Sequence, residues 1–215
     1  MDTDYPYDLI SDPKELARLG EWNEEVYRDF LAYREGRITD QEFRNKHCVK
    51  VAIFCLDMTG FTVSAIRLGE LESLLRIFDV QRVAVPVLKN HGARLIRAFA
   101  DDLVALFDSP DGALDAALET NQRVRAFNAS KLATPFPAET CIGIGYGEVF
   151  SIGPNLAMGD EMNRASKLGE DTARGYEILV TANVRQALNH REDVVFNDQH
   201  LDDLPFPFFS VTPQD

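Results

Sequence analysis

The chain has 215 residues, 45% of them hydrophobic, which suffices for one domain with a core and a short appendage. Its formal net charge of −13 repels phosphate backbones, so we expect no nucleic-acid partner. No run of about eighteen apolar residues occurs, and the acidic start lacks the pattern of a secretory signal, so we expect a cytoplasmic protein without a membrane span.

The first segment with a regular pattern is expected to be helical. After a loose arm over residues 1–10, Asp12 and Pro13 form a helix start, and Gly36 ends the helix. Thr39 then opens a short second helix with a capping box. Because such helices cannot bury an apolar stripe alone, we predict an N-terminal helical extension over residues 1–47 that packs on the main domain, residues 48–215, or on a partner chain. The stripe that predicts one helix of about twenty residues consists of Leu16, Leu19, Trp22, Val26, Phe30 and Tyr33.

The main domain begins with a strand, a long helix and a hairpin. The apolar run 51–57 predicts a buried strand, and a helix follows over about residues 63–89, with Pro86 disturbing its last turn. Two further strands, 94–99 and 103–107, meet at an acidic turn. We expect the inner side of the long helix to carry Leu71, Leu74, Leu75, Phe78 and Val85.

The second half repeats the alternation of strands and helices. We predict a hairpin around Tyr146 and Gly147, between strands 139–145 and 148–152. The order β-α-β-β-α-β with appended elements is typical of an α+β, ferredoxin-like sandwich. The remaining expected helices are 110–131, 158–169 and 182–188, and the remaining strands are 178–181, 194–197 and 208–211.

Two aspartates fall where these strands end. Asp57 closes the first strand and Asp101 lies in the turn of the next hairpin, so a ferredoxin-like sheet would bring them together. Two converging carboxylates repel each other unless divalent ions bridge them, and two such ions can activate a hydroxyl and neutralise a leaving pyrophosphate. Residues 58–62 precede a helix and are typical of a phosphate cradle. Taken singly, each aspartate would be an ordinary turn or cap residue.

Four segments, taken together, resemble the class III adenylyl and guanylyl cyclases. FCLDMTGFT (54–62) is similar to their first metal-binding motif and IRAFADDLVALF (96–107) to the second. IGIGYGEV (142–149) is similar to the central hairpin and GDEMNRASKL (159–168) to the catalytic helix. The resemblance implies a homodimer that turns a nucleoside triphosphate into a 3′,5′-cyclic monophosphate and pyrophosphate, with two Mg²⁺ or Mn²⁺ ions per site.

The same resemblance implies residue roles. One chain would hold the two ions, and the partner chain would supply Asn163 to orient the ribose. Lys167 stands where the family has an arginine that stabilises charge on the α-phosphate; lysine keeps the charge and loses the bidentate fork. Without the other motifs, Asn163 and Lys167 would be a solvated helix face. The implied metal residues are Asp57, Met58 and Asp101, and the implied phosphate-binding residues are Gly60, Phe61 and Thr62.

The positions that read the base depart from both purine patterns, because they fall on Arg97 and Leu156. In this the chain resembles the bacterial Pycsar pyrimidine cyclases, which make cyclic UMP or cyclic CMP as an anti-phage signal. A guanidinium only donates hydrogen bonds and uracil offers carbonyl acceptors, so we favour UTP as substrate. An adenylate or cytidylate cyclase, a catalytically silent nucleotide-sensing module and a polymerase-like palm domain stay open as alternatives; the acidic surface speaks against the last.

Overall fold

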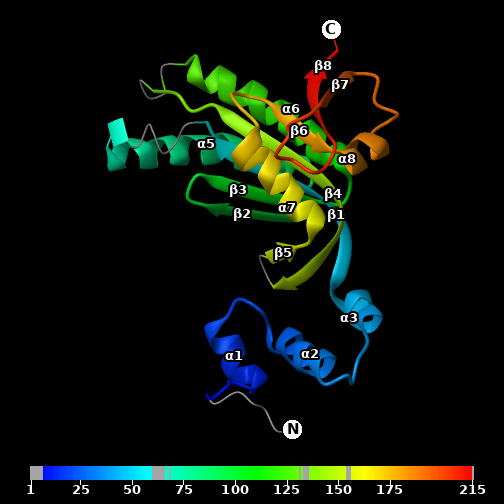
Figure 1. The fold of residues 1–215 in the computed structure, drawn as a ribbon. Coiled ribbons are helices and arrows are strands. Elements are labelled where there is room, and N and C mark those ends of the chain that lie inside the picture. Colours follow the sequence, from blue (N-terminus) through cyan, green and yellow to red (C-terminus); the bar gives the residue numbers. More distant parts are fainter. Residues whose placement is uncertain are drawn as a thin grey trace. The chain divides into compact units, whose positions relative to one another are not determined.

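The computed structural model describes residues 7–59, 66–67, 69–130, 132, 136–153 and 156–214, with only the backbone described at Leu95 and Leu156. The chain divides into two compact units (Figure 1). The first unit comprises residues 1–49 and 150–158, and the second comprises residues 50–149 and 159–215. In the part of the chain described, no helix is long and apolar enough to cross a membrane.

The described residues of the N-terminal unit form three short helices, so the prediction of one helix of about twenty residues is wrong. The break has a local cause, because each helix end has its own cap. Gly20 ends the first helix with an extended backbone. Asn23 begins the second, and its side-chain oxygen accepts a hydrogen bond from the Val26 amide at 2.9 Å. The capping box at Thr39 is confirmed. The helices are α1 (Pro13–Leu19), α2 (Glu24–Arg34) and α3 (Asp40–His47).

An aromatic cluster holds this unit together. The ring centroid of Trp22 lies 5.4 Å from that of Tyr27 and 5.1 Å from that of Phe30. Phe43 on α3 packs on Phe30 at 4.7 Å and on Phe150 at 5.9 Å. Phe150 comes from a strand much later in the chain, so the N-terminal unit is built from two distant stretches of sequence. Tilted aromatic pairs of this kind add stabilisation beyond that of the apolar area that they bury.

The second unit is built around a mixed sheet, which confirms the α+β, ferredoxin-like prediction. The strands follow the order β2-β3-β1-β4-β6-β8-β7 (Figure 1). β5 pairs with the end of β4, and these paired residues, 150–158, belong to the first unit. β1 pairs antiparallel with β3, whereas β4 pairs parallel with β6. The strands are β1 (Cys48–Met58), β2 (Leu95–Phe99), β3 (Asp102–Phe107), β4 (Thr140–Gly153), β5 (Leu156–Met158), β6 (Ile178–Thr181), β7 (Val194–Gln199) and β8 (Phe208–Pro213).

Helices lie on both faces of the sheet. Alternate residues of β1, among them Phe54 and Leu56, enter the main core together with residues of α5 (Glu70–Asn90), α6 (Pro110–Asn128) and the α8 region (Ala182–Ala187). The opposite face is covered by α7 (Asp160–Ser166), which continues directly into the π-helical segment η1 (Lys167–Thr172). Asp57 lies between two core residues of β1, so its side chain points to the α7 face.

Of the residues predicted on the inner side of the long helix α5, Val85 packs against the core, whereas the four earlier ones are exposed. Leu71, Leu74 and Phe78 are 73%, 61% and 53% exposed, and Leu75 is exposed too. The helix instead buries a second stripe of residues at helical spacing, which lies on another side of the helix axis from the exposed leucines. This stripe extends to the C-terminal end of the helix. Pro86 does not end α5, which runs on to Asn90. The buried stripe consists of Ser73, Arg76, Val80, Ala84, Val87 and Leu88.

β4 is one continuous strand, so the predicted hairpin at Tyr146 and Gly147 is wrong. The chain reverses beyond Gly153, where β4 pairs with β5. The glycines of β4 recur at every second residue and serve a close approach of α7 rather than a turn. A Cβ atom on Gly143 would lie 2.1 Å from the Ala165 carbonyl oxygen, a distance that side chains do not tolerate.

Candidate active site

Acidic residues meet at one corner of the sheet. Leu56 of β1 is paired with Leu103 of β3, so Asp57 falls opposite Asp102, the first residue of β3. Asp101 occupies the β2–β3 turn immediately before it, next to Ala100, whose φ of 50° is the left-handed conformation of a tight turn. The structure therefore brings Asp57 and Asp101 together, as the sequence predicts.

The electrostatics of this corner favour a bound cation. Burial, the largest cause, and the neighbouring carboxylates of Asp101, Asp102 and Glu170 together raise the pKa of Asp57 to about 6, against a hydrogen bond from the Met58 amide that lowers it. Burial also raises the pKa of Asp102 to about 6, with Glu170 and Asp101 acting in the same direction. A divalent ion between these groups would relieve their repulsion and their desolvation together.

Sequence reasoning missed Asp102 and Glu170. Asp102 was treated only as a turn residue, and the strand register is what places it opposite Asp57. Glu170 belongs to η1, three residues after Lys167, and its approach to the corner depends on the packing of the helix on the sheet. No sequence spacing signalled this position, because residues 167–172 form a π-helical segment, in which the α-helical spacing of faces does not hold.

The donors suit a metal bound jointly with a substrate. Within the described residues, no group of three or more acidic, histidine or cysteine side chains forms a metal-binding cluster. Mg²⁺ commonly takes one or two carboxylates and completes its shell with phosphate oxygens and water, which the Asp57 and Asp101 pair fits. The Met58 side chain is buried in the core, so only its backbone carbonyl is left as a ligand. Gly60, Phe61 and Thr62 lie outside the described residues.

The predicted catalytic residues project from the α7–η1 helix. Asn163 and Lys167 are exposed and four residues apart, so they share one face of the helix. Lys167 Nζ lies 2.9 Å from Asp171 Oδ2, and this hydrogen bond raises the pKa of Lys167. Lys167 therefore pairs within its own helix, and both side chains stand where a second chain can reach them.

Comparison with known proteins supports the fold. No family model matches the sequence, and no curated protein matches it. Among solved structures, the guanylate cyclase domain of RhGC from Catenaria anguillulae, in complex with GTP, aligns with a TM-score of 0.64 at 20% identity, over 77% of this chain and 97% of that one. The adenylyl cyclase CyaB from P. aeruginosa aligns with a TM-score of 0.65 at 16% identity, over 78% and 96%. An adenylate/guanylate cyclase/hydrolase from Silicibacter pomeroyi gives 0.62 at 25%, over 76% and 95%.

The chain has the fold of a class III nucleotidyl cyclase domain. The carboxylate corner and the α7–η1 helix both lie within this cyclase fold, on the same face of its sheet. Of the two positions predicted to read the base, only Arg97 has a described side chain. Arg97 lies on β2 opposite Val104, and its guanidinium carbon lies 5.8 Å from the ring centroid of Phe99. The side chain of Leu156 lies outside the described part, so its predicted role stays a prediction.

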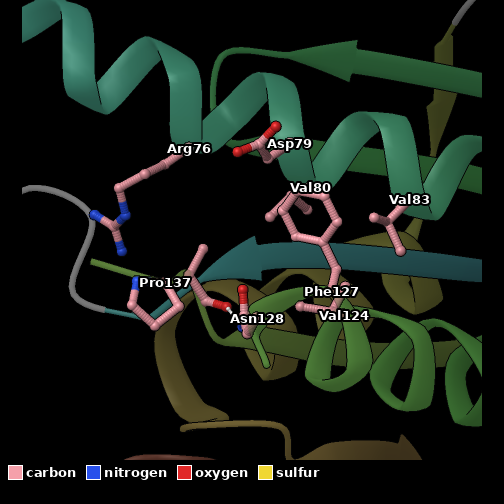
Figure 2. A pocket seen from close by; sticks show the side chains of 9 residues that line it. Arg76, Asp79, Val80, Val83, Val124, Phe127, Asn128 and Pro137 are labelled. Carbon is pink, nitrogen blue, oxygen red and sulfur yellow. Dashed lines mark hydrogen bonds between the residues drawn. The ribbon is translucent and has the colours of Figure 1, made fainter. Parts of the chain in front are cut away.

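Two cavities of the cyclase fold lie away from the carboxylate corner. The first, between α5 and α6, has room for about one water molecule at 10 Å³, so it cannot hold a nucleotide. Figure 2 shows Arg76 beside it. The Arg76 side chain is buried, and its Nε and Nη1 have no hydrogen-bond partner among the residues described. The second is an open cleft of about 400 Å³ beside Tyr146 and Asn183, on the core side of the sheet. Neither cavity includes Asp57 or Asp101.

Proposed function

We propose that this protein is a nucleotidyl cyclase that converts a nucleoside triphosphate into its 3′,5′-cyclic monophosphate and pyrophosphate. The observation that carries the proposal is the pair Asp57 and Asp101, brought to one corner of a cyclase-type sheet with carboxylates as neighbours. Ionised carboxylates that lie together at this corner repel one another and destabilise the fold. Two divalent cations bound with the triphosphate would neutralise this repulsion, which would explain why the acidic residues are gathered there.

The chain's own residues supply positioning and charge. Asp57 and Asp101 would hold Mg²⁺ or Mn²⁺, and the bound ions would supply the charge that activates the ribose 3′-hydroxyl and neutralises the departing pyrophosphate. Asn163 donates to the ribose and fixes the sugar so that its 3′-oxygen faces the α-phosphorus. Lys167 places a positive charge beside the α-phosphate oxygens, where negative charge builds up during the attack. A lysine does this as a point charge, without the fork of an arginine.

A homodimer would complete the site. Leu71, Leu74 and Phe78 present an apolar stripe to solvent, and Phe99 beside the β2–β3 turn is 67% exposed. Exposed apolar groups gathered on neighbouring elements are typical of protein interfaces. The outward direction of Asn163 and Lys167 fits a site in which one chain binds the ions and the other supplies the α7–η1 helix.

The proposed nucleobase is uracil, read by Arg97. Its guanidinium lies near the Phe99 ring, so a cationic donor and an exposed aromatic face stand side by side on the β2–β3 hairpin. Arginine donates to uracil carbonyls, whereas the cytosine amino group would leave donor facing donor. An adenylate or cytidylate cyclase is the alternative within this class. The role in anti-phage signalling rests on the resemblance to the pyrimidine cyclases.

The test is Mn²⁺-dependent pyrophosphate release by the full chain and by Asp57→Ala and Asp101→Ala. We expect each substitution to abolish turnover while circular dichroism shows that the fold remains. Asp198→Ala, an exposed β7 aspartate, is the matched control and should turn over normally. Near-normal turnover in either corner variant would refute the assignment. A wild-type protein that binds triphosphate without releasing pyrophosphate would instead be the silent sensing module.

A further inference from the structure

A buried carboxylate outside the predicted site links α7 to three other elements. Glu161, in the first turn of α7, is 5% exposed. Its carboxylate accepts hydrogen bonds from donors on β4, β6, the α8 helix and α7 itself. These donors are the Tyr146 amide at 3.0 Å, Thr181 Oγ1 at 2.7 Å, Asn183 Nδ2 at 2.9 Å and Arg164 Nη1 at 3.0 Å.

Such a group is held firmly because its own carboxylate is desolvated and the Thr181 hydroxyl that donates to it is buried too. A buried carboxylate is costly without donors, and hydrogen bonds to a charged group are among the stronger ones in proteins. Oε2 joins the Tyr146 amide and Thr181, and Oε1 joins Asn183 and Arg164, so both oxygens are satisfied. Rotating or sliding α7 by one residue would leave donors on β4 and β6 unpaired.

The glycines of β4 determine the distance between α7 and the strand, which the hydrogen bonds of Glu161 do not determine. A Cβ atom on Gly145 would lie 2.5 Å from the Glu161 carbonyl oxygen, and one on Gly147 would lie 2.7 Å from Glu161 Cγ. The backbone of α7 therefore rests directly on β4. The glycines fix how closely the helix approaches, and the Glu161 carboxylate fixes its rotation and its position along the strand.

We propose that Glu161 is a positioning residue for catalysis, which sets the places of Asn163 and Lys167. This rests on the proposed function for the roles of those two residues. Both side chains are exposed, and the ion pair that Lys167 makes among the described residues is with Asp171 of its own helix, so their positions follow from how α7 is seated. Glu161 itself touches no substrate, because its carboxylate is buried beneath the helix.

The first test compares Glu161→Gln with Asn121→Ala, another buried polar junction. Glutamine keeps the size but turns an NH₂ group toward donors. Asn121 on α6 bonds Thr140 and the Tyr176 carbonyl and is not on α7. We expect Glu161→Gln to lower kcat by about 10- to 100-fold with KM within about threefold, since a small displacement of a catalytic group costs that much. Asn121→Ala should destabilise the fold and leave kcat per folded protein unchanged.

A milder variant covers the case in which Glu161→Gln does not fold. Thr181→Val removes one donor without changing the size of the side chain, and Thr181 Oγ1 is bonded only to the Glu161 carboxylate in the hydrogen bonds of the described residues. We expect kcat to fall by about three- to tenfold with KM again little changed. If both variants change kcat no more than Asn121→Ala does, Glu161 is structural only and the proposal is wrong.

Hydrogen exchange provides a readout independent of turnover. Amides of residues 160–166 should exchange at least about tenfold faster in Glu161→Gln or Thr181→Val than in the wild type, while Asn121→Ala should leave them unchanged. Unchanged exchange in α7 would overturn the proposal even if activity fell. If the wild-type protein makes no cyclic product, the proposed function fails by itself, and the exchange experiment still decides whether Glu161 seats the helix.

Discussion

Asp57→Asn should stabilise the metal-free protein above neutral pH. Burial and neighbouring carboxylates raise the folded-state pKa of Asp57 from 3.8 to about 6. The folded state therefore binds a proton more tightly than the unfolded state, and stability falls as pH rises from about 4 to about 6. Two pKa units correspond to about 3 kcal/mol at most, and partial exposure reduces this to roughly 1–1.5 kcal/mol. In a chain of this size, that is an increase in Tm of about 2–6 °C for the neutral side chain.

The assay is thermal unfolding with a chelator, near pH 7.5 and near pH 4, for wild type, Asp57→Asn and the exposed control Asp198→Asn. The gain should be present at the higher pH, nearly vanish at the lower pH and be absent in the control. Mn²⁺ should raise the Tm of the wild type and not that of Asp57→Asn. An Asp57→Asn protein that is less stable than the wild type without metal, or that Mn²⁺ stabilises equally, would contradict the raised pKa of Asp57 and its role in binding the cation.

Three further predictions concern the dimer, the cation and the N-terminal unit. Mixing inactive Asp57→Ala with inactive Asn163→Ala chains should restore about a quarter of wild-type activity, because half of random dimers carry one intact site out of two; no recovery despite measured subunit exchange would contradict a shared site. In single-turnover assays, Lys167→Arg should raise the rate constant of the chemical step, and Lys167→Ala should lower it at least tenfold. Equal rate constants in the three proteins would show that Lys167 takes no part in the chemical step. Phe150→Ala should destabilise the N-terminal unit by about 1–3 kcal/mol, followed by fluorescence of the single tryptophan, Trp22; an unchanged transition would contradict the aromatic cluster.

The sequence predicted the parts of the fold that local rules determine. The strand ending at Asp57 and the hairpin turning at Asp101 follow from short apolar runs bounded by turn residues, and both are confirmed. Thr39 and Gly36 mark helix ends through capping chemistry that needs no tertiary contact. Because Asp57 lies near the end of β1 and Asp101 immediately precedes β3, the strand beside β1, their meeting could be predicted once the strand order was known.

The wrong predictions, which concern the N-terminal helix, the buried face of α5 and the turn in β4, depend on features that apolar spacing and turn residues alone do not reveal. Apolar residues at helical spacing continue through Trp22 and predict one unbroken helix. The chain instead begins a new helix at Asn23, whose side chain caps it by accepting a hydrogen bond from the Val26 amide. α5 carries two apolar stripes, and only the sheet decides that Val80, rather than Phe78, faces the core. The glycines of β4, such as Gly145, look like a turn until α7 is seen resting on them.

The candidate site was predictable for residues that sit in motifs and not for those that act through packing. Asp57 and Asp101 were identified from the sequence, whereas Asp102 and Glu170 join them only through strand register and helix placement. Glu161 lies inside a recognised segment, yet its role depends on donors from β4, β6 and the α8 helix that no sequence spacing brings together.

The most direct test of the central claim is mass spectrometry of the products formed from ATP, GTP, CTP and UTP, each incubated separately with the full chain and Mn²⁺. We expect a 3′,5′-cyclic monophosphate with an equal amount of pyrophosphate, formed fastest from UTP and absent with Asp101→Ala. Faster formation of cyclic AMP than of cyclic UMP would contradict the role of Arg97 and leave the cyclase assignment standing. No cyclic product from any of the four, with a folded dimer that binds Mn²⁺ and triphosphate, would contradict the cyclase assignment itself.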